Sequence, residues 1–267
     1  MSEAISPNHI DAYTPPQMAA LVESVGIRKA ALPALQTATL GLLAGAFIAF
    51  GAMFYTLVMT GNELGFGPGR LLGGLAFSLG LILVVVGGAE LFTGNSLIVM
   101  AWASRKVGTA ALLRNWALVY VANFAGALGT VVLVYFSGTL ELGGGAVGET
   151  AAAIAAGKLR LGFLEAFARG ILSNVLVCLA VWLCYAAHDV AGKILAIIFP
   201  ITAFVALGFE HSVANMYLIP AGMLAAGAID IGGFLGNLVP VTLGNIVGGG
   251  GLVALVYWLV YLRRPAD

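Results

Sequence analysis

The hydrophobic pattern of the chain consists of long apolar runs separated by short polar segments. Because a membrane-spanning helix needs about 20 apolar residues, six runs qualify as spans: 34–60, 71–103, 112–136, 161–187, 194–229 and 236–262. Two of them, 71–103 and 194–229, are too long for one straight crossing, since the first would extend for about 50 Å through a hydrocarbon core of about 30 Å. Each of these two runs therefore predicts a helix that breaks inside the membrane.

The two over-long runs carry the same polar motif near their centres. Glu90 is followed by three residues, a small residue and Asn95, and Glu210 begins the same pattern, which ends at Asn215. An ionisable residue at that depth is costly in hydrocarbon, and paired interruptions in the two halves of a chain mark the substrate region of transport proteins. The pattern therefore predicts a membrane pore where the two breaks meet.

The composition supports a membrane protein. Hydrophobic residues make up 61% of the chain and charged residues only 9%, against about 25% charged residues in soluble domains. The 12 basic and 12 acidic side chains cancel, so the chain has no basic surface suited to nucleic acid. We expect an all-α membrane protein with no nucleic-acid partner.

A polar, glycine-rich stretch at 137–160 divides the six runs into three and three. An odd number of crossings in each half turns the second half upside down relative to the first, which gives a 3+3 inverted repeat with broken helices two and five. We therefore expect a first three-helix repeat at 28–136, an outer linker at 137–160, and a second three-helix repeat with a short cytoplasmic C-terminus at 161–267.

The N-terminal segment 1–27 has the signals of a short amphipathic helix. Thr14 is a favourable N-cap, Pro15 suits the first helical position, Gln17 completes a capping box, and Gly26 is suited to close the helix. We expect this helix to lie at the cytoplasmic membrane face, either as an anchor or as a lid over the pore.

Basic residues predict the orientation of the spans. Eight of the 12 basic residues fall on the side of the N-terminus, three fall on the other side, and Arg169 lies inside a span. The eight are Arg28, Lys29, Arg105, Lys106, Arg114, Lys193, Arg263 and Arg264. Because basic loops stay in the cytoplasm, both termini are expected there.

His211 is the single histidine at the depth of the breaks. An imidazole there can donate hydrogen bonds to an anion or pass it a proton, and its charge can change between about pH 5 and 8; the simpler interpretation is a histidine held between helices. Thr93, Asn174 and Asn245 are uncharged donors within the spans, suited either to a passing oxyanion or to helix-to-helix hydrogen bonds. Both interpretations stay open.

Glu90 and Glu210 also permit two interpretations. As pore carboxylates they would favour cations, whereas as structural groups they would accept backbone N–H groups freed where the helix breaks. We favour the structural role. Lys158, with Arg160 and Arg169, is a candidate for gathering anions at the outer entrance.

A membrane-embedded metalloenzyme is the competing class. It would need a nucleophile with a base, or several ligands on neighbouring turns as in His-Glu-x-x-His, and neither pattern occurs. Glu210-His211 with Glu90 is at best a sparse metal set. We therefore expect a protein that is not an enzyme and uses no cofactor or metal.

Taken together, these motifs resemble the formate/nitrite transporter family, and within it the formate channels. The resemblance is carried by the stretches 87–95, 169–174, 208–216 and 244–249. It implies an aquaporin-like fold of six helices per protomer, a homopentamer in the bacterial cytoplasmic membrane, and one pore per protomer. The implied cargo is a small monovalent anion, formate first, with nitrite or hydrosulfide as the alternative.

The resemblance also implies roles for individual residues. Thr93, Asn174, His211 and Asn245 become the polar contacts of the pore, and Lys158 becomes an entrance charge. The implied apolar constrictions on either side of the histidine are formed by Phe77, Leu81, Leu91, Phe92, Val177 and Phe204. Because a bare anion loses more hydration than a neutral acid in a dry ring, proton sharing with His211 would lower the barrier for a weak acid.

Overall fold

The computed structural model describes residues 12–263, and within that range the chain is entirely helical. The start of the N-terminal segment and Arg264 lie outside the described residues. The elements are α1 (Pro15–Ala31), α2 (Ala34–Met59), α3 (Phe66–Gly87), the 3₁₀ turn η1 (Gly94–Ile98), α4 (Val99–Ala103), α5 (Thr109–Phe136), η2 (Thr139–Glu141), α6 (Ala146–Leu159), α7 (Phe163–Cys184), α8 (Val190–Ala206), α9 (Ser212–Ala226), α10 (Ile231–Ile246), the π-helical segment η3 (Val247–Leu255) and α11 (Val256–Tyr261).

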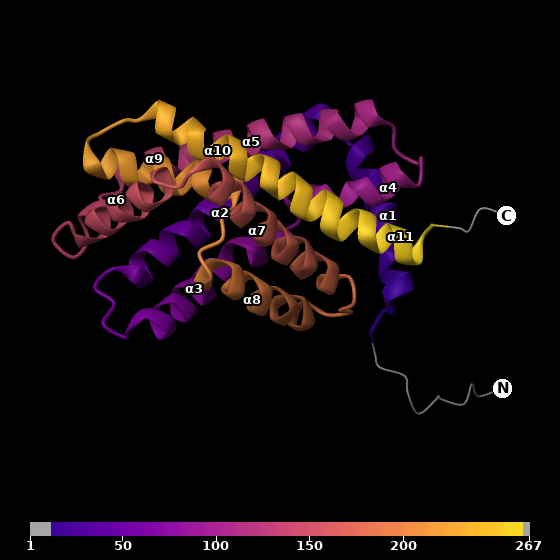
Figure 1. The fold of residues 1–267 in the computed structure, drawn as a ribbon, viewed down its shortest axis with the longest axis horizontal. Helices are drawn as coiled ribbons and strands as arrows, with labels where there is room; N and C mark the ends of the chain where they lie inside the picture. Colours follow the sequence, from indigo (N-terminus) through magenta and orange to yellow (C-terminus); the bar gives the residue numbers. More distant parts are fainter. Residues whose placement is uncertain (1–11, 264–267) are drawn as a thin grey trace.

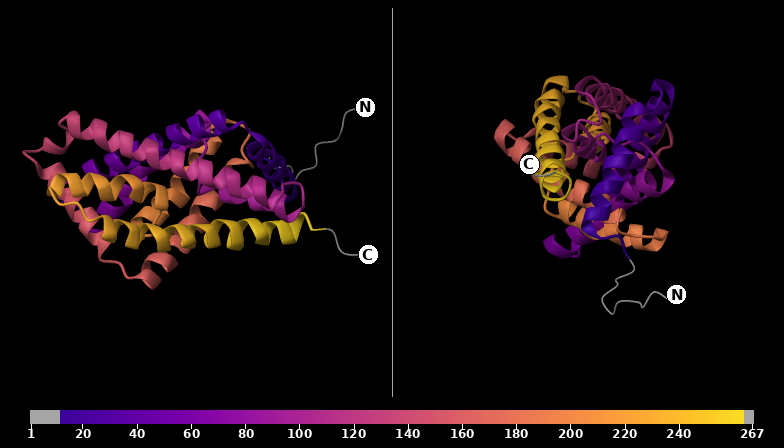
Figure 2. Two further views of the ribbon diagram at one scale, coloured as in Figure 1. Left: turned by 90° about the horizontal axis from the view of Figure 1, so that it is seen from above. Right: turned by 90° about the vertical axis from the view of Figure 1, so that its right-hand side faces the viewer.

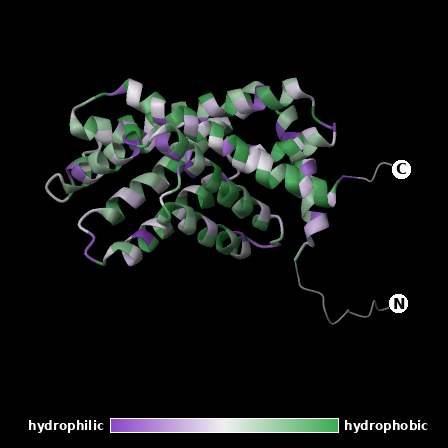
Figure 3. Ribbon diagram, in the orientation of Figure 1, coloured by the Kyte–Doolittle hydropathy of each residue, from purple (hydrophilic) through white to green (hydrophobic). Residues whose placement is uncertain are grey.

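Five helical segments are long and apolar enough to cross a membrane, judged by length and composition. They are α2, α3, α5, α7 and the continuous helix Ile231–Tyr261. Three shorter apolar segments, Gly94–Ala103, Val190–Ala206 and Ser212–Ala226, complete the set. Figure 3 colours most of these helices as hydrophobic, as expected for a protein whose helices contact lipid.

The two over-long runs break where the sequence predicted. Helix α3 ends at Gly87, and the chain becomes helical again at Gly94; helix α8 ends at Ala206, and α9 begins at Ser212. Directly after each first half, a glycine takes a left-handed conformation, Gly88 with φ +80° and Gly208 with φ +72°. Glycine adopts this conformation without steric cost, so these residues allow both helices to stop inside the protein.

Helix α1 begins as predicted but does not end at Gly26. The backbone N–H of Thr14 donates to Gln17 Oε1 at 2.8 Å, one half of the expected capping box. The helix continues to Ala31, and Pro33 then limits its extension. Gly26 is needed for close packing instead, because an added Cβ would lie 3.3 Å from the Cβ of Ala101.

The segment 137–160, expected as an outer linker, contains helix α6. Its sequence is rich in alanine, the strongest helix former, a signal that the glycine-rich character of the segment obscured. Helix α6 packs against α9, much as α1 packs against η1 and α4. In Figure 1, α6 and α9 lie at one end of the molecule and α1 and α11 at the other, and the same separation is visible from above in Figure 2.

Glycine lets the crossing helices approach closely. An added Cβ at Gly45 of α2 would lie 2.0 Å from the carbonyl oxygen of Asn123 in α5, and one at Gly244 of α10 would lie 2.2 Å from that of Phe167 in α7. Both positions belong to the small-residue spacings of the sequence. The pairs α2–α5 and α7–α10 therefore form two closely packed walls on which the breaks are held.

The two helix breaks and the candidate pore

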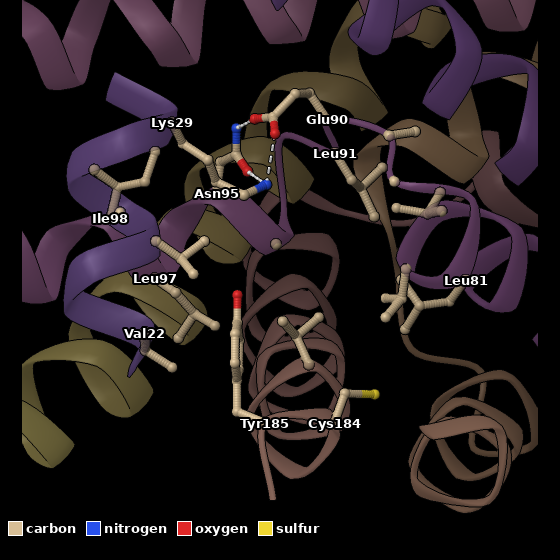
Figure 4. Close-up of a pocket in the computed structure, with 18 of the residues that line it drawn as sticks. Val22, Lys29, Leu81, Glu90, Leu91, Asn95, Leu97, Ile98, Cys184 and Tyr185 are labelled. Carbon is tan, nitrogen blue, oxygen red and sulfur yellow. Dashed lines mark hydrogen bonds and ion pairs between the residues drawn. The ribbon is translucent and has the colours of Figure 1, made fainter. Parts of the chain in front are cut away.

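The first break is organised around the carboxylate of Glu90. Lys29 of α1 forms an ion pair with Glu90 Oε1 at 2.8 Å, and Asn95 Nδ2 donates to Glu90 Oε2 at 2.7 Å. Figure 4 shows both side chains directed at this carboxylate. Asn115 of α5 completes the cluster, since its Oδ1 accepts from Asn95 at 2.9 Å and its Nδ2 donates to the carbonyl of Lys29 at 3.1 Å.

The second break repeats this arrangement with different residues. Lys158 of α6 pairs with Glu210 Oε1 at 2.8 Å, and Asn215 Nδ2 donates to Glu210 Oε2 at 2.7 Å. Asn237 of α10 accepts from Asn215 at 2.7 Å and donates to the carbonyl of Lys158 at 3.0 Å. Each carboxylate thus contacts a lysine and an asparagine side chain rather than the freed backbone N–H groups that the sequence suggested.

Two further asparagines bind the interrupted backbone. Asn123 Nδ2 donates to the carbonyls of Gly41 and Glu90 at 2.7 and 2.9 Å, while its Oδ1 accepts the N–H of Phe92 at 2.9 Å. The sequence offered Asn123 only as one polar residue in an apolar run. The contact shows that it supplies the hydrogen bonds that the broken helix has lost.

Asn245 does the same in the second break. Its Nδ2 donates to the carbonyls of Gly170 and Glu210 at 2.8 and 3.1 Å, and its Oδ1 accepts the N–H of Ser212 at 2.9 Å. The side chain is fully buried and bonded at both ends of its amide. In this structure Asn245 therefore holds the backbone, and it is not among the residues that line the cavities described below.

His211 joins the two breaks. Its Nδ1 accepts the N–H of Ala214 at 3.1 Å, which caps α9, and its Nε2 lies 2.8 Å from Thr93 Oγ1 in the first break. Because Nδ1 is an acceptor here, a neutral ring carries its proton on Nε2 and donates it to Thr93. The hydroxyl proton of Thr93 then remains for another acceptor. His211 is only 2% exposed.

Asn174 holds the backbone of Thr93 by a hydrogen bond. Its Nδ2 lies 3.3 Å from the carbonyl of Thr93, 3.2 Å from Ser96 Oγ and 2.6 Å from the carbonyl of Asn245. The residue is fully buried. It therefore links the backbone of the first break, at Thr93, to the backbone of α10, at Asn245.

Cavities of similar size open on the two sides of this junction. The α1-side cavity has a volume of about 270 Å³, and its charged residues are Lys29, Glu90 and Lys193. The α6-side cavity has a volume of about 280 Å³, and its charged residues are Arg70, Lys158, Arg169 and Glu210. Basic groups outnumber acidic ones in both, which favours small anions.

Four of the six predicted constriction residues lie along these cavities. Leu81 and Leu91 line the α1-side cavity, and Figure 4 shows both side chains at its wall. Phe77 and Phe204 line the α6-side cavity, with ring centroids 5.5 Å apart, and the Phe204 ring lies 5.9 Å from that of His211. Apolar side chains therefore line both cavities, and Phe204 of the α6-side cavity lies beside the histidine.

The other two predicted constriction residues lie elsewhere. Phe92 packs edge-on against Trp116 and Tyr120 of α5, at 6.1 and 4.8 Å between ring centroids. Val177 is buried in the core and is not among the residues that line either cavity. The backbone N–H of Phe92 is held by Asn123, a contact that hydropathy could not reveal.

Lys158, the predicted entrance charge, does line the α6-side cavity, but its side chain is 15% exposed and paired with Glu210. Two arginines also line this cavity: Arg169, which the sequence grouped with Lys158 at the entrance, and Arg70, to which it gave no role. Arg70 Nε donates to the carbonyl of Ala206 at 2.5 Å, and Arg169 Nη1 donates to that of Gly208 at 3.1 Å. They satisfy carbonyls at the end of α8 and add positive charge to the cavity.

A buried polar junction between two broken helices, with a positively charged cavity on each side, defines an integral membrane protein for the passage of small solutes. A family model described as formate/nitrite transporter matches residues 16–259. The chain therefore belongs to the formate/nitrite transporter family, a family of transport proteins and not of enzymes.

Individual relatives agree with this assignment. The chain is 41% identical to the formate channel FocA of Escherichia coli K12, over 96% of this chain and 97% of the relative. It is 43% identical to the uncharacterized transporter YrhG of Bacillus subtilis 168, over 94% of each chain.

Solved structures share the fold. A pentameric formate channel with formate bound superposes with a TM-score of 0.79 at 42% identity, over 86% of this chain and 98% of the other. A channel described as an FNT family ion channel superposes with a TM-score of 0.82 at 26% identity, over 91% and 98% of the two chains.

Proposed function

We propose that the protein is a homopentameric channel that passes formate, and related small monovalent anions such as nitrite, through the bacterial cytoplasmic membrane. Each protomer crosses the membrane six times as a 3+3 inverted repeat with both termini in the cytoplasm. The repeated contact sets at Glu90 and Glu210 support the repeat, and the printed description of the similar pentameric channel supports the assembly and the substrate.

The pore runs from the α1-side cavity past Leu81 and Leu91 to Thr93 and His211, and leaves through the α6-side cavity. The observation that carries this proposal is the hydrogen bond of 2.8 Å between His211 and Thr93, the polar contact between the two apolar sections. An anion that leaves the positively charged cavities would meet the hydroxyl proton of Thr93 at this point. That donor replaces part of its lost hydration.

A shared proton would lower the barrier further, because a neutral weak acid loses less hydration than its anion in an apolar ring. Only the imidazolium form of His211 has a proton to give at ordinary pH. That form donates from both nitrogens, so Nδ1 must first release the N–H of Ala214. Protonation is therefore coupled to movement at the start of α9.

Two variants test this role in reconstituted liposomes. His211→Ala removes both the cap and the proton carrier, whereas His211→Asn keeps an acceptor suited to the N-cap but carries no proton. Both should lose the pH dependence of formate uptake, and only the alanine variant should also lose about 1 kcal/mol of stability. Unchanged pH dependence in the asparagine variant would refute proton sharing.

The choice of anion is tested in the same liposomes by competition. Formate, nitrite and hydrosulfide each carry one negative charge, so the cavity charges alone do not separate them. If formate is the main substrate, it should compete against labelled formate more strongly than nitrite or hydrosulfide across the pH range. Stronger competition by nitrite would move the assignment to the other branch of the family.

A further inference from the structure

A third cavity lies away from the pore, at the end of the molecule that carries α1 and α11 (Figure 1). It has a volume of about 710 Å³ and shares no lining residue with the two pore cavities. Its walls come from α1, the turn after α4, and the end of α11. The residues are Glu23, Ala103, Ser104, Arg105, Lys106, Trp258, Tyr261, Leu262 and Arg263.

The charge of this cavity is positive. Lys106 forms an ion pair with Glu23 at 2.5 Å, so these two groups largely neutralise each other. Arg105 and Arg263 remain, both exposed, and neither forms an ion pair with another residue in the range 12–263. Two guanidinium groups at one cavity match the geometry of a phosphate, which they bind through paired N–H donors.

The backbone at Arg105 is unusual. Its φ is +59°, the only positive value at a non-glycine residue among the described part of the chain. Glycine normally occupies this position at the end of a helix, and a long side chain there is unfavourable. The turn is held by the N–H of Arg105, which donates to the carbonyl of Trp102 at 2.9 Å. An arginine in place of glycine brings a charge to the cavity wall.

The apolar and aromatic groups beside the cavity are typical of a membrane interface. Trp258 donates from Nε1 to Ser104 Oγ at 3.0 Å, and Tyr261 lies one turn further along the helix. Trp and Tyr favour the level of the lipid headgroups. Leu255 and Leu259, which lie on the same continuous helix and precede Arg263 along the chain, are exposed, so apolar side chains are available near the cavity for acyl chains.

We propose that this cavity binds the phosphate of an anionic phospholipid, held by Arg105 and Arg263, with its acyl chains along Leu255 and Leu259. Inorganic phosphate presents the same phosphate oxygens, but it has no acyl chain to contact the exposed apolar side chains beside the site. A single phosphodiester charge also suits the cavity, whose other two charged groups are paired.

The experiment measures lipid binding to the complete, detergent-purified protein by native mass spectrometry. Phosphatidylglycerol and the zwitterionic phosphatidylcholine are titrated separately, and inorganic phosphate is added as a competitor. Arg105→Gln combined with Arg263→Gln should weaken phosphatidylglycerol binding about 25-fold, from about fivefold for each arginine at a membrane surface, and leave phosphatidylcholine binding unchanged. Arg114→Gln is the matched control, an exposed arginine of α5 outside the cavity.

A second variant separates charge from folding. Arg105→Gly places the residue that prefers positive φ at this position, so it should fold at least as well as the wild type and still lose about fivefold in phosphatidylglycerol affinity. Unchanged binding in these variants, or an equal loss in Arg114→Gln, would overturn the site. Displacement of the lipid by millimolar inorganic phosphate would overturn the assignment to a phospholipid. Formate uptake of all variants should match the wild type.

Discussion

The two helix breaks are built from the same contacts but differ in the four residues between the glutamate and the asparagine. In both, a lysine pairs with the glutamate at 2.8 Å, and an asparagine donates to the same carboxylate at 2.7 Å. The residue after each glutamate is Leu91 in the first break and His211 in the second. The shared contacts stabilise the interruption of the helix, and the chemistry of the pore lies where the two breaks cease to match.

The difference at the residue after the glutamate is reflected in how the following helix begins. His211 caps α9, so the helix starts at the next residue. Leu91 has no acceptor to offer, and helical turns resume only at Gly94, after Thr93. Thr93 lies in the irregular segment of the first break, and its hydroxyl is 2.8 Å from His211 Nε2. The central contact therefore depends on the asymmetry of the two breaks.

The largest effect is expected when the shared contacts are removed. Asn123→Ala and Asn245→Ala each remove the partner of one carbonyl and one N–H in a break, those of Glu90 and Phe92 in the first and those of Glu210 and Ser212 in the second. At about 1–3 kcal/mol for each unpaired group, we expect a loss of about 2 kcal/mol or more for each variant. Thermal unfolding in detergent measures the change.

The control for the asparagine variants is Thr130→Val on α5, because that hydroxyl bonds only the carbonyl of Gly126 in its own helix. It should lose less than 1 kcal/mol, the usual size of a hydrogen bond between membrane helices. Similar losses of stability in Asn123→Ala and Asn245→Ala would support the view that the two asparagines stabilise the two breaks to the same extent. A large loss in only one of them would mean that the two breaks are stabilised differently.

The sequence-based predictions succeeded where a feature depends on neighbouring residues and failed where it depends on residues far apart in the chain. Spans and breaks depend on the length of apolar runs and on local glycines. The two breaks were confirmed, and five helical segments are long and apolar enough to cross a membrane. Helix α6 was missed because a glycine-rich loop precedes its alanine run. For Asn245 the residues left a pore contact and a helix-to-helix bond equally open, because an amide in an apolar helix has the same pattern in both cases, and the pore role came from the resemblance. Only the fold decides between them.

Lysine partners illustrate the same limit. Lys29 was counted as one basic residue of a cytoplasmic loop, yet it pairs with Glu90, far away along the chain. The pairing of Lys158 with Glu210 is equally remote in sequence. These two ion pairs could have been inferred only by aligning the two halves of the chain so that α1 corresponds to α6. Helix α6 had not been predicted.

A substitution in the closely packed helix pairs that hold the breaks, α2–α5 and α7–α10, is expected to have an intermediate effect on stability. The second wall contains the π-helical segment η3, whereas the first continues as regular helix through α5. Gly249 lies in η3, where an added Cβ would be 2.3 Å from Asn174 Nδ2 and 2.7 Å from Cys178 Sγ. Gly249→Ala should therefore displace Asn174 and, through it, Thr93. We expect a loss of about 1–3 kcal/mol, as for other overpacked cores.

Gly251→Ala is the matched control, because an added Cβ there has no atom within 4 Å. It should leave stability unchanged or raise it slightly, since alanine favours helices. Formate uptake should fall in Gly249→Ala and stay at the wild-type rate in Gly251→Ala. If both variants behave alike, η3 is not what positions Thr93, and the asymmetry of the walls has no part in the pore.

The smallest effect concerns the charges of the two cavities. On the α6 side, Arg70 and Arg169 are fixed by carbonyls at the end of α8. On the α1 side, the ion pair of Lys29 with Glu90 leaves Lys193 as the one further basic residue at the cavity, and Lys193 forms no ion pair within residues 12–263. Lys193→Met should therefore remove the excess positive charge of that cavity.

A single charge near the path of an anion, at a dielectric between protein surface and water, is worth about 1 kcal/mol, so formate uptake at low salt should fall about fivefold. Lys193→Arg keeps the charge and should retain the wild-type rate. Raising the salt concentration should reduce the difference between the two variants, since mobile ions screen the field of the lysine. Equal uptake by Lys193→Met and the wild type at low salt would show that the α1-side cavity admits anions without an excess of positive charge, and that the unequal charges of the two cavities do not control entry.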